Sequence, residues 1–193
     1  MKPAVIVVDM LNDNVHGKHA GPVRDAALAI VPAINRLLAA AHERGWPVVF
    51  ACDSFLPDDF IFRGRMKPHS LRDTPGAEPI PELHRAPGDV MLPKRRFSAF
   101  FKTDLDQTLR LRAADTVLVA GISTHFCVLA TAFDAVANDF QAVIIEDACA
   151  AAKPEWHAAT LACYRSNVLR PLLRVQPVAA VLQDAGTPPP PSA

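Results

Sequence analysis

The segment VLVAGISTHFCVLATAFDA, residues 117–135, carries the clearest fold signal in the chain. It opens with an unbroken apolar run of strand length that ends at Gly121, and a helical pattern follows from about 125 to 138. A strand that is apolar at every position predicts burial on both faces. Such burial is typical of a parallel sheet covered by helices on both sides.

The same alternation of strand and helix runs through the rest of the chain. The predicted strands are 4–8, 46–52, 116–120 and 142–146. The predicted helices are 24–44, 103–112, 125–138 and 154–165, with a weaker strand and helix within 167–182. Thr103 and Asp106 resemble a capping box at the start of the second of these helices. The predicted fold class is α/β, a three-layer α/β/α arrangement with a mostly parallel sheet of about six strands.

The length of 193 residues fits one domain of ordinary size. We expect a single domain over 1–183 and a flexible, Pro-rich tail over 184–193. Between 53 and 93 the sequence is rich in Pro and charge and has no clear periodicity. In a compact domain, a segment of this kind predicts a functional loop region that lies over a site.

Charge and cysteine usage exclude several classes of protein. The 20 basic and 20 acidic side chains balance, so we expect neither a nucleic-acid partner nor a membrane partner. No apolar run reaches the roughly 18 residues of a membrane span, and the N-terminus lacks a signal-peptide pattern, so we expect a cytoplasmic protein. The cysteines form no C-x-x-C pair, which argues against a disulfide framework and a zinc finger.

Reactive side chains fall where the predicted strands end. Asp9 and Asp53 each close a strand, Lys94 follows the apolar pair Met91 and Leu92, and Cys127 opens the helix after Gly121. Ligands of open parallel sheets bind at the carboxyl ends of the strands, so these side chains are expected to converge. Each also has a plainer interpretation: Asp9 as a turn former, Lys94 as part of a solvated KRR run, and Cys127 as a buried core residue.

A carboxylate, an ammonium group and a thiol together suit nucleophilic catalysis. The thiolate is the reactive form of cysteine, and a helix N-terminus with a nearby lysine is expected to lower the pKa of the thiol. A carboxylate within reach can take the thiol proton and return it to a leaving amine.

The sequence resembles the isochorismatase-like cysteine hydrolase superfamily, which includes nicotinamidases and N-carbamoylsarcosine amidohydrolases. The resemblance rests on AVIVVDMLND, ACDS, PHSLRDTPGAE, LPKRRFSAF and, most specifically, VLVAGISTHFCVLATAFDA. It implies hydrolysis of a carbon–nitrogen bond in a small amide, carbamoyl compound or lactam. The implied catalytic residues are Asp9 as base and acid, Lys94 between acid and thiol, and Cys127 as nucleophile.

The resemblance also implies a cis peptide bond between Ile122 and Ser123. In the family this bond turns the Ser123 N–H toward the site, where it forms an oxyanion hole with the Cys127 N–H.

The metal site of nicotinamidases is incomplete in this sequence. Asp53 and His69 match two of the family's ligands, but the position between them is Phe55, which cannot coordinate a metal. We therefore expect no cofactor, although a divalent metal such as Zn is the family's usual ion, and Asp53 and His69 are vestigial candidates for its ligands. Without a metal, the alternatives for His69 are a hydrogen bond to Asp53 or to the substrate, or a structural position in the loop. Phe55 then supplies an apolar wall where the metal contact would be.

The remaining substrate-binding candidates flank the nucleophile. His125 and Phe126 stand where family members differ, and with Phe55 and His69 they are expected to shape the pocket for a small-molecule amide. The Phe-rich loop and the apolar helix after Cys127 also suggest a homo-oligomer, a dimer or higher, as is common in the family.

Two other functions remain open at this point. A vinyl ether hydrolase of the isochorismatase type uses the aspartate and lysine without a cysteine, and Cys127 argues against it. A non-catalytic ligand-binding or thiol-sensor protein on the same fold has no need of the complete set Asp9, Lys94 and Cys127. A dinucleotide-binding protein is disfavoured because no G-x-G-x-x-G motif follows any strand.

Overall fold

The computed structural model describes residues 1–18 and 20–184, and its centre is a six-stranded parallel sheet. The strands are β1 (Pro3–Val8), β2 (Val48–Asp53), β3 (Val90–Lys94), β4 (Thr116–Ile122), β5 (Gln141–Ala150) and β6 (Leu173–Gln176). They lie in the order β3-β2-β1-β4-β5-β6, and every neighbouring pair is parallel. The predicted α/β class and strand number are confirmed.

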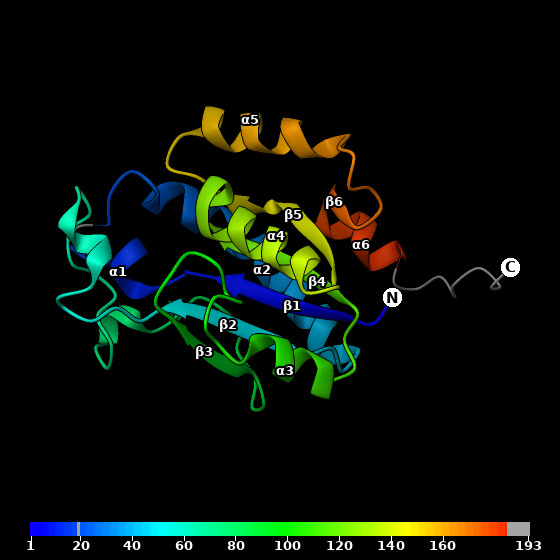
Figure 1. The fold of residues 1–193 in the computed structure, drawn as a ribbon, viewed down its shortest axis with the longest axis horizontal. Coiled ribbons are helices and arrows are strands. Elements are labelled where there is room, and N and C mark those ends of the chain that lie inside the picture. The colour runs from blue at the N-terminus through cyan, green and yellow to red at the C-terminus, as the bar shows by residue number, and fades with distance from the viewer. Residues whose placement is uncertain (19, 185–193) are drawn as a thin grey trace, which may run out of the picture.

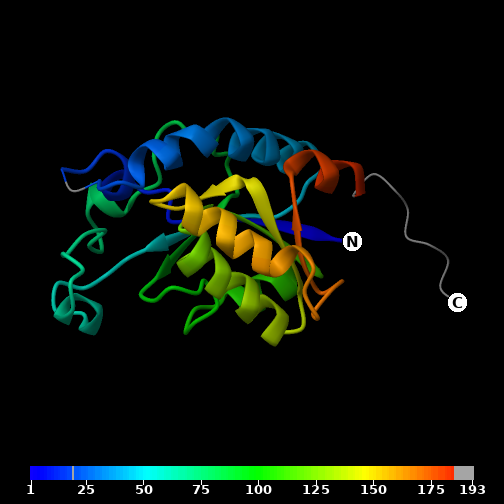
Figure 2. The ribbon, with the colours of Figure 1, turned by 90° about the horizontal axis from the view of Figure 1, so that it is seen from above.

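Helices cover both faces of this sheet (Figures 1 and 2). One face carries α2 (Arg24–Glu43) and α6 (Val178–Asp184), and the other carries α3 (Leu105–Leu111), α4 (Leu129–Ala137) and α5 (Pro154–Arg165). Shorter helical turns are α1 (Asn12–Val15), η1 (Phe60–Arg63), η2 (Pro75–Ala77) and η3 (Thr124–Val128). The three-layer arrangement follows from central strands β1, β2 and β4, which are buried at every position.

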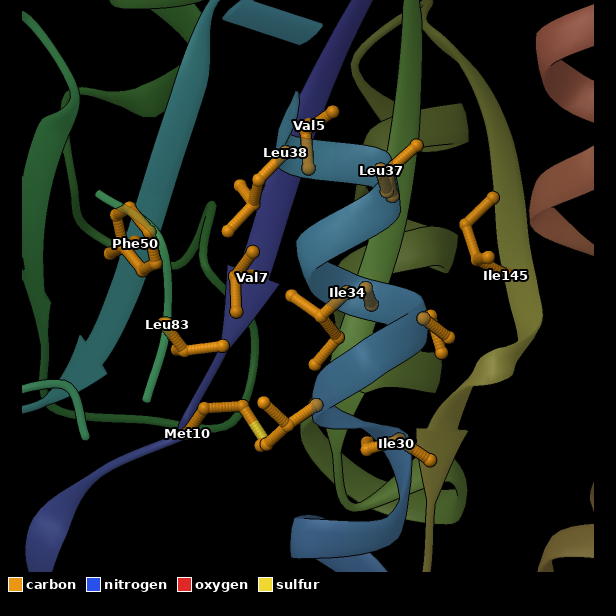
Figure 3. Packing of buried hydrophobic residues seen from close by; sticks show 14 of the residues in the cluster. Val5, Val7, Met10, Ile30, Ile34, Leu37, Leu38, Phe50, Leu83 and Ile145 are labelled. Atoms are coloured by element: carbon orange, nitrogen blue, oxygen red, sulfur yellow. The ribbon is translucent and has the colours of Figure 1, made fainter. Parts of the chain in front are cut away.

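Alternating side chains of β1 build a core on each side of the sheet. Val5 and Val7 pack in the cluster under α2, whereas Ala4, Ile6 and Val8 belong to the cluster under α3, α4 and α5. In Figure 3, Leu37 and Leu38 of α2 point toward the strands of the sheet. Burying one such aliphatic side chain contributes about 1.5–3 kcal/mol, so these two layers hold the strand ends in place.

Several predicted boundaries shift. The predicted 125–138 helix begins as the π-helical turn η3 and becomes α-helical only at Leu129, and β5 extends four residues beyond the predicted strand. The capping box at Thr103 forms only in part. Its hydroxyl oxygen accepts the Leu105 N–H at 3.3 Å and the hydroxyl donates to the Ala99 carbonyl, but Asp106 bonds Arg110 instead of Thr103, and Asp104 is the N-cap of α3 without a side-chain cap bond. The local sequence matched the motif, but the hydroxyl has a partner in the preceding turn.

The last elements of the described chain are a strand and a helix. The weak pair predicted within 167–182 corresponds to β6 and α6. The predicted Pro-rich tail lies outside the described residues, apart from Asp184 at the end of α6. Within the described residues, no helix has the length and apolarity that a bilayer span demands.

Candidate active site

The carboxyl ends of four neighbouring strands lie at the same edge of the sheet. Asp53 and Lys94 are the last residues of β2 and β3, Asp9 follows β1, and Ile122 ends β4 just before the cysteine turn. Because β3, β2, β1 and β4 are adjacent in the sheet, these residues meet at one edge, as the strand-end argument predicted.

The ammonium group of Lys94 lies at the centre of this cluster. Its Nζ donates to Asp9 Oδ2 at 2.8 Å, to Asp53 Oδ1 at 2.5 Å and to the Arg96 carbonyl at 3.2 Å, which uses all three of its N–H groups. The Lys94 side chain is 1% exposed. The interpretation of Lys94 as part of a solvated run is therefore wrong, because its charge is buried and paired with two carboxylates.

The backbone around Asp9 fixes the direction of its carboxylate. Asp9 has a φ of 52°, in the left-handed region that aspartate tolerates better than most residues. Its Oδ1 accepts the backbone N–H of Asp53 at 2.9 Å, and its own carbonyl accepts bonds from Leu11 N and Asn14 Nδ2. Both carboxylate oxygens thus have donors, and the side chain does not serve merely to cap a turn.

Gly121 lets β4 approach β1 at the site. Its φ is 110°, and a Cβ at this position would lie 2.1 Å from the carbonyl oxygen of Val8, the residue before Asp9. Any side chain here would push the end of β4 away from Asp9. The glycine between strand and turn is therefore required by close backbone contact.

Cys127 lies in η3, directly after this glycine turn. The Ser123 carbonyl accepts the N–H groups of Phe126 and Val128, and the peptide bond between Ile122 and Ser123 is cis. The Cys127 sulfur and carboxylate oxygens of Asp9 and Asp53 all lie within 4.8 Å of one another. A thiol, two carboxylates and an ammonium group therefore share one buried cluster.

The environment of Cys127 favours the neutral thiol. Burial raises the pKa of Cys127 well above its usual value, the Asp9 charge raises it further, and Lys94 opposes both effects. The expectation of a lowered thiol pKa is wrong for the free protein. The helix begins with a π turn, the sulfur is almost fully buried, and two carboxylates outweigh one ammonium group.

The pKa values of Asp53 and Lys94, the two charged groups beside Asp9, are both raised. Burial and the nearby Asp9 charge raise the pKa of Asp53 to about 7, although Lys94 opposes this rise. Burial alone would lower the pKa of Lys94, but the charges of Asp9, Cys127 and Asp53 raise it well above its usual value. Lys94 is therefore a permanent cation, while Asp53 exchanges a proton near neutral pH.

A pocket of about 200 Å³ opens above the cluster. It is lined by Asp9, Asn14, Val23, Asp53, Phe55, Ile61, Met66, His69, Phe97, Ile122, Ser123, Phe126 and Cys127. Three of the four predicted substrate residues, Phe55, His69 and Phe126, are on this wall. The fourth, His125, is not among the lining residues, because its ring packs between Phe126 and Trp156.

Part of the pocket wall could not be predicted from the sequence. Val23 comes from the start of α2, and Ile61 and Met66 come from the long loop. Ile61 lies in the short run FIF (60–62) and Met66 between Arg65 and Lys67, and neither belongs to a periodic pattern that would assign it to a pocket.

The vestigial metal ligands do not form a metal site. His69 packs its ring against Phe55 at 5.5 Å between centroids, and its Nδ1 bonds the Lys67 carbonyl. Among the described residues, the group of ligand-type side chains that converges is Asp9, Asp53 and Cys127, without His69, and Lys94 already bonds both carboxylates. The residues present do not fit the family's metal, since a cation would displace the ammonium group from its partners.

The fold and this strand-edge cluster agree with the comparisons with known proteins. The isochorismatase domain family matches residues 3–174. The chain belongs to the isochorismatase family. The resemblance predicted from the sequence is thereby confirmed, and it spans nearly all of the described chain.

Named relatives in the isochorismatase family are varied. A probable inactive nicotinamidase from Arabidopsis thaliana is 34% identical over 82% of this chain and 85% of its own length. The ureidoacrylate amidohydrolase RutB of Variovorax paradoxus is 33% identical over 75% of this chain and 67% of its own length. The crystal structure of N-carbamoylsarcosine amidase from Thermoplasma acidophilum has a TM-score of 0.77 and 35% identity, covering 92% of this chain and 97% of that one.

Proposed function

We propose that the protein is a cysteine-dependent amidohydrolase that cleaves a carbon–nitrogen bond of a small amide, carbamoyl compound or lactam through a thioester. The observation that carries this proposal is the convergence of Asp9 and Cys127 in the wall of one pocket, with Lys94 bonded to Asp9. A thiol beside a buried carboxylate is the pairing that nucleophilic catalysis by cysteine requires. Relatives named as amidohydrolases of non-peptide carbon–nitrogen bonds support the same reaction class.

In the acylation step, the Cys127 thiol becomes the nucleophile. Asp9 accepts the thiol proton while the sulfur attacks the carbonyl carbon, forming a carbon–sulfur bond and a tetrahedral oxyanion. The N–H groups of Ser123 and Cys127 are proposed to donate to this oxyanion. When the intermediate collapses, the carbon–nitrogen bond breaks, and Asp9 returns its proton to the leaving nitrogen as ammonia or an amine departs.

Hydrolysis of the thioester restores the enzyme. Asp9 takes a proton from water, the hydroxide oxygen attacks the thioester carbonyl, and the same two N–H groups hold the second oxyanion. The carbon–sulfur bond then breaks, Asp9 returns the proton from water to the sulfur, and a carboxylic acid leaves. For a lactam, the amine remains attached to the product, so no ammonia appears.

The raised pKa of Cys127 shapes this mechanism. The resting thiol is protonated at neutral pH because burial and Asp9 disfavour the thiolate. Proton transfer to Asp9 therefore accompanies attack on a bound substrate. Lys94 offsets the charge of the two carboxylates throughout the cycle, since its ammonium group bonds both of them. The metal of nicotinamidases has no step in this scheme.

The charge of the pocket favours an uncharged substrate. Among its described lining residues, Asp9 and Asp53 carry carboxylates, most others are apolar, and none is lysine or arginine. A substrate carboxylate buried here would lie beside the Asp9 carboxylate, and the Lys94 ammonium group is already bonded to both Asp9 and Asp53. Arg63 and Arg96 line a separate outer cavity, and Arg96 already donates to Asp59.

The test is turnover of a small panel by the wild type and by Cys127→Ala. Ammonia release is measured with neutral aryl and alkyl amides, carbamoyl amino acids and biuret, and lactam opening is followed by mass change. The expected result is turnover of neutral amides that disappears in Cys127→Ala. Activity of that variant on a vinyl ether would favour the isochorismatase-type reaction, and silence across the panel with tight ligand binding would favour a binding protein.

A homo-oligomer remains part of the proposal. The residues Phe60, Phe97 and Phe126 are 71%, 42% and 56% exposed, and the rings of Phe97 and Phe126 stack at 6.0 Å between centroids beside the pocket. Exposed aromatic clusters of this kind are typical of protein interfaces. Light scattering of the purified protein is expected to give the mass of a dimer or a larger assembly, and a monomer would contradict this part of the proposal.

A further inference from the structure

The cysteine turn η3 is held from outside by α5. The hydroxyl of Thr124 lies 2.9 Å from Nδ1 of His157, and the ring of His125 contacts that of Trp156 at 5.1 Å between centroids. Both partners are consecutive residues of α5. The turn that carries the nucleophile is therefore tied to a helix that contributes no residue to the pocket wall described above.

Thr124 is at a sensitive position within this turn. It follows Ser123, precedes Cys127 by three residues, and is completely buried. A buried hydroxyl needs a hydrogen-bond partner, and an imidazole from a distant part of the chain provides it. Burial lowers the pKa of His157, so the ring is neutral at pH 7 and keeps one acceptor nitrogen and one donor nitrogen.

The helix α5 has few other attachments to the body of the protein. Leu161 is the one buried residue among the described residues of α5. Tyr164 packs edge-on against Phe133, and Arg165 forms an ion pair with Glu146. These contacts fix the far half of the helix. The near half is held against η3 by the bond between His157 and Thr124 and by the contact of Trp156 with His125.

We propose that His157 is a positioning residue that holds the cysteine turn in its reactive arrangement through Thr124. The role rests on the proposed function, because the groups it positions are the Ser123 and Cys127 N–H donors and the Cys127 sulfur. His157 does not touch the substrate. Its effect is on kcat, since displacement of reacting groups by about 1 Å costs on the order of 100-fold in rate.

The first test compares two amide replacements at one position. In His157→Asn a polar atom stands where Nδ1 stands in histidine, whereas in His157→Gln the corresponding atom stands at the place of Nε2. We expect His157→Asn to retain turnover and His157→Gln to lower kcat about 10-fold to 100-fold with KM unchanged. Thr124→Val is expected to match His157→Gln, and the double variant to be no worse than either single one, because both remove the same bond.

The second test reads the position of Cys127 without any substrate. Iodoacetamide labelling is followed by peptide mass spectrometry, with exposed Cys163 as the reagent reference and buried Cys149 as the reporter of global unfolding. In His157→Gln we expect faster labelling of Cys127, because the loosened turn exposes the sulfur, and unchanged labelling of Cys149. Thr160→Ala, which removes a hydroxyl of α5 bonded within the helix, is the matched control and should change neither rate.

These readouts separate the possible outcomes. Equal turnover in His157→Asn, His157→Gln and the wild type would overturn the positioning role. Faster labelling of Cys149 together with Cys127 would also overturn it, because the residue would then act only on global stability. If the wild type hydrolyses no amide, the proposed function fails, while the labelling of Cys127 still decides whether His157 holds the turn.

Discussion

The ammonium group of Lys94 lies 2.8 Å from Asp9 Oδ2, and both side chains are almost fully withdrawn from solvent. Asp53 completes the arrangement as a second carboxylate on the same ammonium group. A buried ion cluster of this kind is costly to desolvate, so its value lies in what it positions. Here it holds one carboxylate beside the thiol of Cys127.

Replacing Lys94 by methionine removes the partner of two buried carboxylates. We expect the free energy of unfolding of Lys94→Met to fall by about 3–5 kcal/mol at pH 7, measured by urea denaturation. The loss should shrink at pH 5, because the pKa of Asp53 is about 7 and its carboxyl group is then protonated and needs no cationic partner. Lys102→Met, at an exposed lysine, serves as the control. An equal loss in both variants would show that the charge cluster has no special role.

Asp53 predicts a pH dependence of stability. Its pKa in the folded protein is about 7, above the ordinary value of 3.8, so between these values the folded state binds more protons than the unfolded state. Its contribution therefore becomes less favourable as pH rises from about 4 to about 7. Asp53→Asn should remove a slope of at most about 1.4 kcal/mol per pH unit in this window, measured by denaturation at several pH values. An unchanged slope would mean that Asp53 titrates normally.

Asp9→Asn is predicted to move two readouts in opposite directions. Turnover should fall by about 100-fold to 10,000-fold, because the base that accepts the thiol proton is gone. Labelling of Cys127 by iodoacetamide should become faster, because the Asp9 charge helps to raise the pKa of that thiol. Slower labelling would contradict the assigned direction of the Cys127 shift.

The metal is predicted to be dispensable. Turnover by the wild type should be unchanged after dialysis against a strong chelator, and metal analysis should find less than one zinc per chain. Phe55→His, which places an imidazole between Asp53 and His69, tests whether the missing ligand at position 55 is the reason. Loss of wild-type activity on chelation, recovered with zinc, would contradict the conclusion that Phe55 and Lys94 leave no place for the ion.

The strand-end residues could be predicted from sequence because parallel strands bring their ends together. The apolar runs before Asp9, Asp53 and Gly121 fix the strands, and the topology then places the polar residues at one edge. The π turn at Cys127 could not be predicted, because its hydrogen bonds to the Ser123 carbonyl have no signature in the helical apolar pattern.

Side-chain partners far apart in the chain were beyond the reach of sequence patterns. Nothing near Thr124 points to His157, which lies 33 residues later on another helix. The rise in the pKa of Cys127 likewise could not be predicted from the sequence, because it depends on burial and on two carboxylates from other strands. His69 was expected near a metal or a substrate. Its contact with Phe55 depends on the conformation of the loop, which the sequence does not indicate.

The most direct measurement is intact mass spectrometry of the enzyme, quenched with acid during turnover of its best amide substrate. We predict a transient increase in protein mass equal to the acyl group minus one hydrogen, located on the peptide that contains Cys127 and absent from Cys127→Ala. The adduct should disappear once the substrate is consumed. Full turnover by Cys127→Ala, or an adduct on any other residue, would contradict a thioester mechanism at this site.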